Sequence, residues 1–210
     1  MSWGARWPEE SRASDHMAVT VLGIAGSARR GGNTDTLLDW CLDAARGEGA
    51  EIVRFRLCDL DLRGCRACDA CFEDGRCIQQ DDMQKLYPHL RTADSVVVAA
   101  PVYSMGMPGI PKIVIDRCQP FWALKYVLKQ PLNEAGGPER LGAFLTCAGT
   151  NFAHVFEGSR RNIRYLWHVL GVTAAGEMLC PEVDARGEIL KQADAKTVAE
   201  DIGVRLGRQR

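Results

Sequence analysis

The sequence predicts an α/β fold with a doubly wound, five-stranded parallel sheet in the strand order 2-1-3-4-5, with helices on both faces. Apolar segments of strand length alternate with segments in which apolar residues recur at helical spacing. This alternation is typical of a mostly parallel sheet with right-handed crossovers. Two motifs follow the first and third predicted strands, whose loops border the ligand site of such sheets.

The five predicted strands differ in expected burial. The first is an almost unbroken apolar run, as expected of a strand covered on both faces, whereas the second alternates apolar with polar residues, as an edge strand does. The third is β-branched and stops at Pro101, as a central parallel strand would. The predicted strands are 19–25, 51–58, 95–100, 141–148 and 172–179.

One predicted helix follows each strand. Asp81 and Asp82 supply a cap before the second helix, and the third begins near Pro108 and is expected to bend at Pro120. A surface connection rich in glycine and proline follows it at 131–139. The apolar residues that mark the helices are Leu38, Cys41, Leu42 and Ala45; Met83, Leu86, Tyr87 and Leu90; Ile110, Val114 and Ile115; Ile163, Leu166, Trp167 and Leu170; and Leu190, Ala193, Val198, Ile202 and Leu206.

The composition is that of one ordinary globular domain, which we assign to 18–210. The chain has 210 residues, 46% hydrophobic and 25% charged, with a formal net charge of −1. Because it lacks both a basic excess and an apolar run of roughly 18 residues, we expect no nucleic-acid partner and no membrane span. Residues 1–17, which contain no secretory apolar region, are expected to be a disordered tail. Nine cysteines without an export signal favour reduced thiols in a cytoplasmic protein.

The first predicted strand leads into a segment suited to binding an anion. Its glycines let the backbone approach a ligand closely, and small polar side chains offer hydrogen-bonding groups. The segment lies at the N-terminus of a predicted helix, where free backbone N–H groups favour a phosphate. It matches neither the Gly-x-Gly-x-x-Gly pattern nor the Walker pattern. The candidate contacts are Ser27, Arg29, Gly32, Asn33 and Thr34.

This segment, Gly26-Ser-Ala-Arg-Arg-Gly-Gly-Asn-Thr34, resembles the FMN-phosphate loop of the flavodoxin-like NAD(P)H-dependent FMN reductases. Its usual form in those proteins is Gly-Ser-x-Arg, a short spacer and Asn-Thr. They often have proline where this chain has Ala28, a departure that leaves the phosphate contacts intact. The resemblance implies the flavodoxin-like fold, FMN as cofactor and NAD(P)H as electron donor.

The segment that ends the third predicted strand resembles the Pro-Val-Tyr flavin loop of the same reductases. A flat isoalloxazine ring needs a close backbone, small residues and an apolar or aromatic surface, and backbone N–H groups near the ring tune its redox properties. A further contact is expected where the fourth strand ends. The candidate flavin contacts are Pro101, Val102, Tyr103, Ser104 and Gly106, with Thr146 and Gly149 from the fourth strand.

An irregular insertion at 59–80 contains four cysteines with the spacing Cys-x2-Cys-x2-Cys-x5-Cys. Soft thiolates select an iron–sulfur cluster or zinc, and three cysteines at consecutive x2 spacing favour a [4Fe-4S] cluster over structural zinc. Zinc is therefore the second interpretation. Reduced thiols in a structural loop are the third, because cluster-free relatives in the resembling family carry a similar loop followed by an Asp-Asp pair. The candidate cluster ligands are Cys65, Cys68, Cys71 and Cys77.

All four cysteines match the compact motif of the iron–sulfur flavoproteins, a branch of the same family. This resemblance implies an FMN oxidoreductase that passes electrons from NAD(P)H or a reduced protein to a small acceptor such as a quinone or free flavin. The cofactor carries this chemistry, so no catalytic acid or base is assigned. The alternative is an electron carrier for ferredoxin-like partners, assembled as a homodimer or homotetramer that brings cluster and flavin close together. A flavin-binding sensor or scaffold is the third interpretation.

Overall fold

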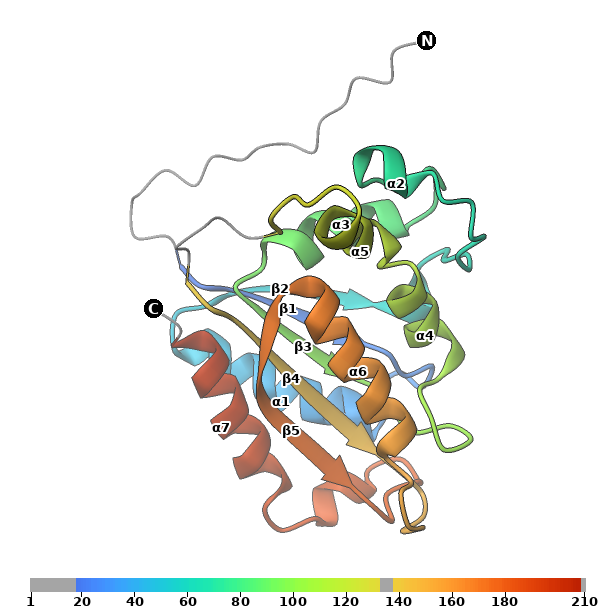
Figure 1. Ribbon diagram of the computed structural model, residues 1–210. Coiled ribbons are helices and arrows are strands. Elements are labelled where there is room, and N and C mark those ends of the chain that lie inside the picture. The colour runs from blue at the N-terminus through green and yellow to red at the C-terminus, as the bar shows by residue number, and fades with distance from the viewer. Residues whose placement is uncertain (1–17, 133–137, 209–210) are drawn as a thin grey trace.

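The computed structural model describes residues 18–132 and 138–208, which form a parallel five-stranded sheet covered by helices (Figure 1). The strand order is β2-β1-β3-β4-β5, so the predicted fold class and order are confirmed. The predicted tail at 1–17, and residues 133–137 of the predicted connection, lie outside the described residues. The strands are β1 (Thr20–Ala25), β2 (Glu51–Arg56), β3 (Ser95–Ala99), β4 (Arg140–Cys147) and β5 (Val172–Cys180).

Burial along the strands follows from their places in the sheet. The central strand β3 is buried at every position, whereas every residue of β2, at the edge, is exposed or half-buried. Alternate side chains point to opposite faces. Val96 and Val98 therefore join one hydrophobic core, and Val97 and Ala99 join the other.

Two groups of helices close these cores. On one face lie α1 (Asn33–Gly47) and α7 (Ala195–Gly207), which approach so closely that a Cβ at Gly203 would lie 2.0 Å from the carbonyl oxygen of Cys41. The other face is covered by α3 (Met83–Thr92), α4 (Gly109–Asp116), α5 (Gln119–Tyr126) and α6 (Glu157–Leu170). Helices therefore cover both faces, as predicted.

The structure corrects three details of the predicted elements. The second strand ends at Arg56, because Leu57 turns into the core as the start of a 3-10 helix, η1 (Leu57–Asp59). The insertion is not wholly irregular, since it contains a one-turn helix, α2 (Cys71–Asp74). The last helix begins at Ala195 and not at Leu190, which lies in a separate 3-10 helix, η2 (Glu188–Lys191).

The predicted bend at Pro120 is confirmed as a break between two helices. Helix α4 ends at Asp116, and α5 begins at Gln119 with Pro120 in its first turn, where a proline needs no intrahelical donor. None of the helices in the described parts of the chain is long and apolar enough to cross a bilayer.

Candidate functional site

The loop of residues 26–32, here called the anion loop, joins β1 to the N-terminus of α1. Ser27 Oγ accepts the backbone N–H of Arg29 at 3.1 Å, which holds the turn. Gly32 is the N-cap, and within the described residues no side chain caps the helix. The first backbone N–H groups of α1 are therefore available to a ligand, at the end of the helix where its dipole favours negative charge.

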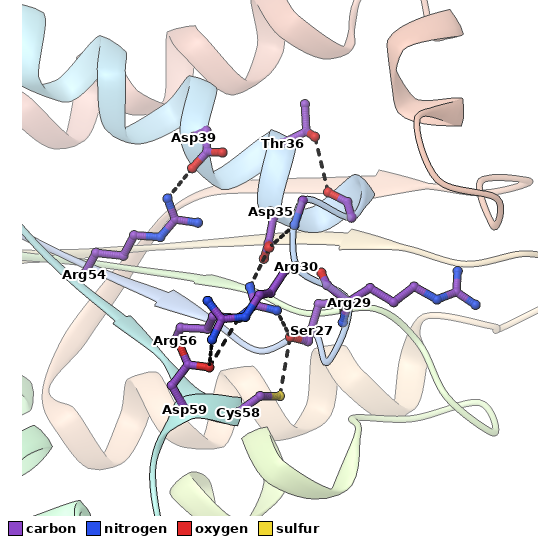
Figure 2. Close-up of polar contacts among 12 residues, drawn as sticks. Ser27, Arg29, Arg30, Asp35, Thr36, Asp39, Arg54, Arg56, Cys58 and Asp59 are labelled. Carbon is purple, nitrogen blue, oxygen red and sulfur yellow. Dashed lines mark hydrogen bonds and ion pairs between the residues drawn. The ribbon is translucent and has the colours of Figure 1, made fainter.

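Two charged side chains hold the anion loop in place by hydrogen bonds to its backbone (Figure 2). Asp35, in the first turn of α1, accepts the backbone N–H of Gly31 at 2.9 Å and pairs with Arg56 of β2 at 2.6 Å. Arg56 also donates to the carbonyl oxygen of Ser27 at 3.1 Å. Both side chains of this pair are nearly inaccessible, with exposures of 4% for Asp35 and 12% for Arg56. The pair fixes both ends of the loop and leaves its outer side open.

That outer side forms a hollow of about 60 Å³ at the carboxyl ends of the strands. All five residues predicted in the anion loop and the first turn of α1 line it, and so do four of the seven predicted from the third and fourth strands. The predicted residues that line the hollow are Ser27, Arg29, Gly32, Asn33, Thr34, Pro101, Val102, Tyr103 and Gly149. The residues that sequence reasoning missed are Cys147, Val183, Asp184 and Arg186.

The segment 181–187 after β5, here called the β5 loop, forms the wall of the hollow that the sequence did not predict. The Asn33 side chain fastens it: the amide donates to the carbonyl oxygen of Ala185 at 2.9 Å, and the side-chain oxygen accepts the backbone N–H of Gly187 at 3.0 Å. Arg29 donates to the carbonyl oxygen of Asp184 at 2.9 Å. The Asn33 side chain, which we expected to face the ligand, thus binds protein backbone instead.

The predicted ring-binding segment folds as a tight hairpin. Tyr103 and Gly106 exchange backbone hydrogen bonds of 3.0 and 2.9 Å, and Ser104 and Met105 between them have φ values of +49° and +64°. Left-handed backbone is unfavourable for side-chain-bearing residues, so this tip stores strain of the kind that gathers at ligand sites. Tyr103 and Met105 are 48% and 44% exposed, which leaves an aromatic and an apolar surface beside the hollow.

Three predicted contacts do not line the hollow. Ser104 and Gly106 belong to the hairpin beside it, and a Cβ at Gly106 would meet no atom closer than the Tyr103 carbonyl oxygen at 4.0 Å. Thr146 is wholly buried in β4, and its hydroxyl has no hydrogen-bond partner in the described structure. The space beside Gly106 is therefore open in the direction in which a Cβ would point.

The four predicted cluster ligands line a second cavity of about 420 Å³. Cys65 and Cys68 are exposed, whereas Cys71 and Cys77 are partly buried. Burial and, to a smaller extent, the charges of the neighbouring thiols raise the pKa of Cys71 to about 11. Within the described chain, no three His, Cys, Asp or Glu side chains stand close enough together to hold a metal ion. The structure thus gathers the four sulfurs around one cavity without bringing them into a ligand set.

The two ends of the cysteine segment (residues 59–80) are fastened together at its base. Asp82 accepts the backbone N–H of Asp61 at 2.8 Å, and Asp81 accepts that of Arg63 at 2.9 Å. Asp81 also forms a fully buried ion pair with Arg117 at 2.6 Å. Burial alone would raise the pKa of the Asp81 carboxyl, but hydrogen bonds from Arg117 and the Arg63 backbone hold that pKa below its usual value.

Comparison with known proteins agrees with this geometry. Residues 19–163 match the family described as NADPH-dependent FMN reductase. An iron–sulfur flavoprotein of Methanosarcina thermophila is 29% identical over 159 residues, which span 76% of this chain and 78% of that protein. An iron–sulfur flavoprotein of Methanocaldococcus jannaschii is 34% identical over 125 residues, or 60% of this chain and 63% of that protein.

Among solved structures, a flavone reductase is similar with a TM-score of 0.66 at 18% sequence identity, covering 90% of this chain and 62% of that one. At this identity the likeness concerns the fold, and it agrees with the observed strand order. The chain belongs to the NADPH-dependent FMN reductase family, and the relatives named above are iron–sulfur flavoproteins.

Proposed function

We propose that the protein is an FMN-dependent oxidoreductase that passes electrons from NAD(P)H or a reduced protein donor to a small acceptor such as a quinone or free flavin. One observation carries this proposal. The uncapped N-terminus of α1 and the anion loop open into a hollow that the Pro101–Tyr103 segment also lines, so an anion site and an aromatic surface lie side by side. This is the pairing that a phosphorylated flavin requires.

Residues of this chain would hold FMN at both of its ends. The backbone N–H groups of Thr34 and its neighbours would bind the phosphate, with the Ser27 hydroxyl nearby. Tyr103, Ser104 and Gly106 would contact the ring, and Gly149 would lie at the far wall. When bound, FMN supplies the electron-accepting and electron-donating chemistry, and the protein supplies binding and orientation.

The chemistry of the four thiols, though not their present spacing, also suits an iron–sulfur cluster. Four soft sulfur donors surround one cavity, and Ala67 and Asp69 between them adopt left-handed φ values of +48° and +55°. Such strained backbone needs support from its surroundings. We therefore propose Cys65, Cys68, Cys71 and Cys77 as ligands of a [4Fe-4S] cluster, a choice that agrees with the names of the relatives. Iron analysis separates this proposal from zinc and from free thiols.

The visible absorption spectrum of the purified protein tests the proposed function. We expect flavin bands, or their appearance when FMN is added to flavin-free protein, and oxidation of NADH or NADPH in the presence of a quinone. Separate assays with each nucleotide identify the donor. A protein with no flavin bands that also fails to bind FMN on titration would contradict the proposal.

The second candidate is an electron carrier between ferredoxin-like partners, with no substrate chemistry of its own. The exposure of Cys65 and Cys68 favours it, because a cluster held there would lie at the protein surface, within reach of a partner. A homodimer or homotetramer would bring that cluster close to the flavin of a neighbouring subunit. Reduction by reduced ferredoxin, without NAD(P)H oxidation, would select the carrier.

We also propose a cytoplasmic location. All nine cysteines are free in the structure, and reduced thiols persist in that compartment. Protein isolated under thiol-trapping conditions should therefore carry nine alkylated cysteines once any cluster has been removed. Disulfides found in such a preparation would contradict the assignment.

A further inference from the structure

Arginines surround the anion loop, and the structure separates them by their partners. Arg29 pairs with Asp184 at 3.7 Å, Arg30 with Asp59 at 2.5 Å, and Arg56 with Asp35 at 2.6 Å. The last two pairs are drawn in Figure 2. Each of these guanidinium charges therefore already faces a carboxylate of the protein.

Arg186 differs from these arginines. It lies in the β5 loop and lines the hollow next to the start of α1, and within the described residues no carboxylate pairs with it. Its Nη2 donates to the carbonyl oxygen of Arg30 at 2.9 Å, which ties the end of the side chain to the anion loop. A guanidinium carries five N–H donors, so most of its donors remain available to an anion.

The backbone that carries Arg186 is held in place. Asn33 makes hydrogen bonds on both sides of Arg186, to the carbonyl oxygen of Ala185 and to the N–H of Gly187. The Glu188 carboxylate accepts the N–H groups of Asp184 and Ala185 at 2.7 and 2.8 Å, which closes the turn. The backbone at Arg186 is therefore ordered before a ligand binds, although the side chain itself is exposed.

We propose that Arg186 is a second cationic residue of the phosphate site, which binds the terminal phosphate of FMN together with the N-terminus of α1. A phosphate monoester carries nearly two negative charges at neutral pH. Arg29 already forms an ion pair with Asp184, whereas Arg186 has no carboxylate partner within the described residues. The planar guanidinium group can donate two parallel hydrogen bonds to phosphate oxygens. The proposal rests on the proposed function, because it takes the ligand of this hollow to be FMN.

Binding of FMN and of riboflavin, which has the same ring system but no phosphate, tests the role of Arg186. Both ligands are titrated into flavin-free protein and their fluorescence is followed. In Arg186→Gln we expect FMN to bind roughly 10- to 100-fold more weakly, the range for a hydrogen bond to a charged group, while riboflavin binds as it does to the parent. The FMN affinity of Arg186→Lys should lie between those of the parent and Arg186→Gln, because lysine keeps the positive charge and lacks the planar guanidinium group. FMN binding should also weaken with salt more steeply in the parent than in Arg186→Gln.

The control is Arg91→Gln, which removes the same charge from the last turn of α3, just before β3 begins and so at the opposite end of the sheet. It should leave both affinities unchanged. If Arg186→Gln binds FMN as tightly as the parent, or if it loses FMN and riboflavin equally, Arg186 has no phosphate role. If the parent itself binds no FMN, the proposed function fails first, so the two failures are distinguishable.

Discussion

Asp81 and Arg117 form an ion pair that is closed to solvent, with exposures of 0% and 1%, and the pair joins the cysteine segment to the α4–α5 junction. Arg117 Nη1 and Nη2 lie 2.6 and 3.0 Å from the two oxygens of Asp81, and Nη1 also donates to the carbonyl oxygen of Arg63 at 2.7 Å. The Tyr87 hydroxyl donates to the carbonyl oxygen of Arg117 at 2.8 Å. One guanidinium thus fixes the base of the cysteine segment to the core.

Replacing Arg117 with methionine should destabilise the protein by about 3–5 kcal/mol, because the Asp81 carboxylate is left buried without its partner. Urea unfolding measures this loss. The control is Arg208→Met, which removes an exposed pair with Glu48 at 2.6 Å and should change the stability little, because solvent screens such pairs. Equal effects of the two substitutions would show that the buried pair has no special structural role.

The same pair predicts how stability depends on pH. The folded-state pKa of Asp81 is lowered from its usual value, so its contribution to stability is complete above the unfolded-state pKa of about 3.9. That contribution is lost as the pH falls from about 4 through the folded-state pKa. Urea midpoints measured from pH 7 to pH 3 should therefore fall more steeply in the parent than in Asp81→Asn, which has no proton to gain. Parallel curves for the two proteins would contradict the assignment.

Much of the fold followed from the sequence because periodicity reports local burial. The apolar runs and helical spacings gave the strands and the helices, and the resemblance to the flavodoxin-like reductases implied the sheet order that the structure has. The α2 helix was missed because four residues are too few to show a period. Leu190 was placed in the last helix on its spacing, yet it is 67% exposed, while its neighbour Ile189 is fully buried. Spacing alone could not tell which of the two faces the core.

The anion loop was predicted because its glycines and small polar residues follow one another in the sequence. The β5 loop was not, because its contacts with Asn33 join positions more than 150 residues apart and its own sequence carries no periodic pattern. For the same reason the role of Asn33 was misassigned. Its residue type suggested a hydrogen-bond donor to the ligand, whereas the structure shows its side chain bound to the backbone of the β5 loop. The available clue to the β5 loop was its polar residues, because the loop after the last strand of a parallel sheet lies at the same edge as the loops after the other strands.

The cysteine cavity predicts that Cys68→Ala loses the cluster and retains FMN. Anaerobically purified parent should contain four irons and four sulfides per flavin, the composition of a [4Fe-4S] cluster, and the variant should contain little of either. The anion loop lies outside the cysteine segment, so the flavin content of the variant should match that of the parent. Cys118→Ala is the control, because this buried cysteine packs in the core and does not line the cavity. An iron-free anaerobic parent that still holds FMN would leave a flavoprotein without a cluster.

Gly158, in the first turn of α6, lets that helix approach the tip of the 103–106 hairpin. A Cβ at Gly158 would lie 2.3 Å from the carbonyl oxygen of Met105, a distance that forces the backbone to move. Gly158→Ala should therefore cost about 1–3 kcal/mol of stability, as overpacking does elsewhere. It should also weaken FMN binding, because the displaced hairpin is the proposed contact for the ring.

Gly109→Ala separates this steric effect from the general effect of adding a methyl group to a helix. Gly109 lies in the first turn of α4, also beside the hairpin, and a Cβ there would meet no atom within 4 Å. Alanine at that position should leave stability unchanged or raise it by up to about 1 kcal/mol, because glycine is the poorer helix former. Thermal unfolding and FMN titration of both variants test the prediction. A Gly158→Ala protein as stable as Gly109→Ala, with parental FMN affinity, would mean that the hairpin yields without cost and that its position does not govern flavin binding.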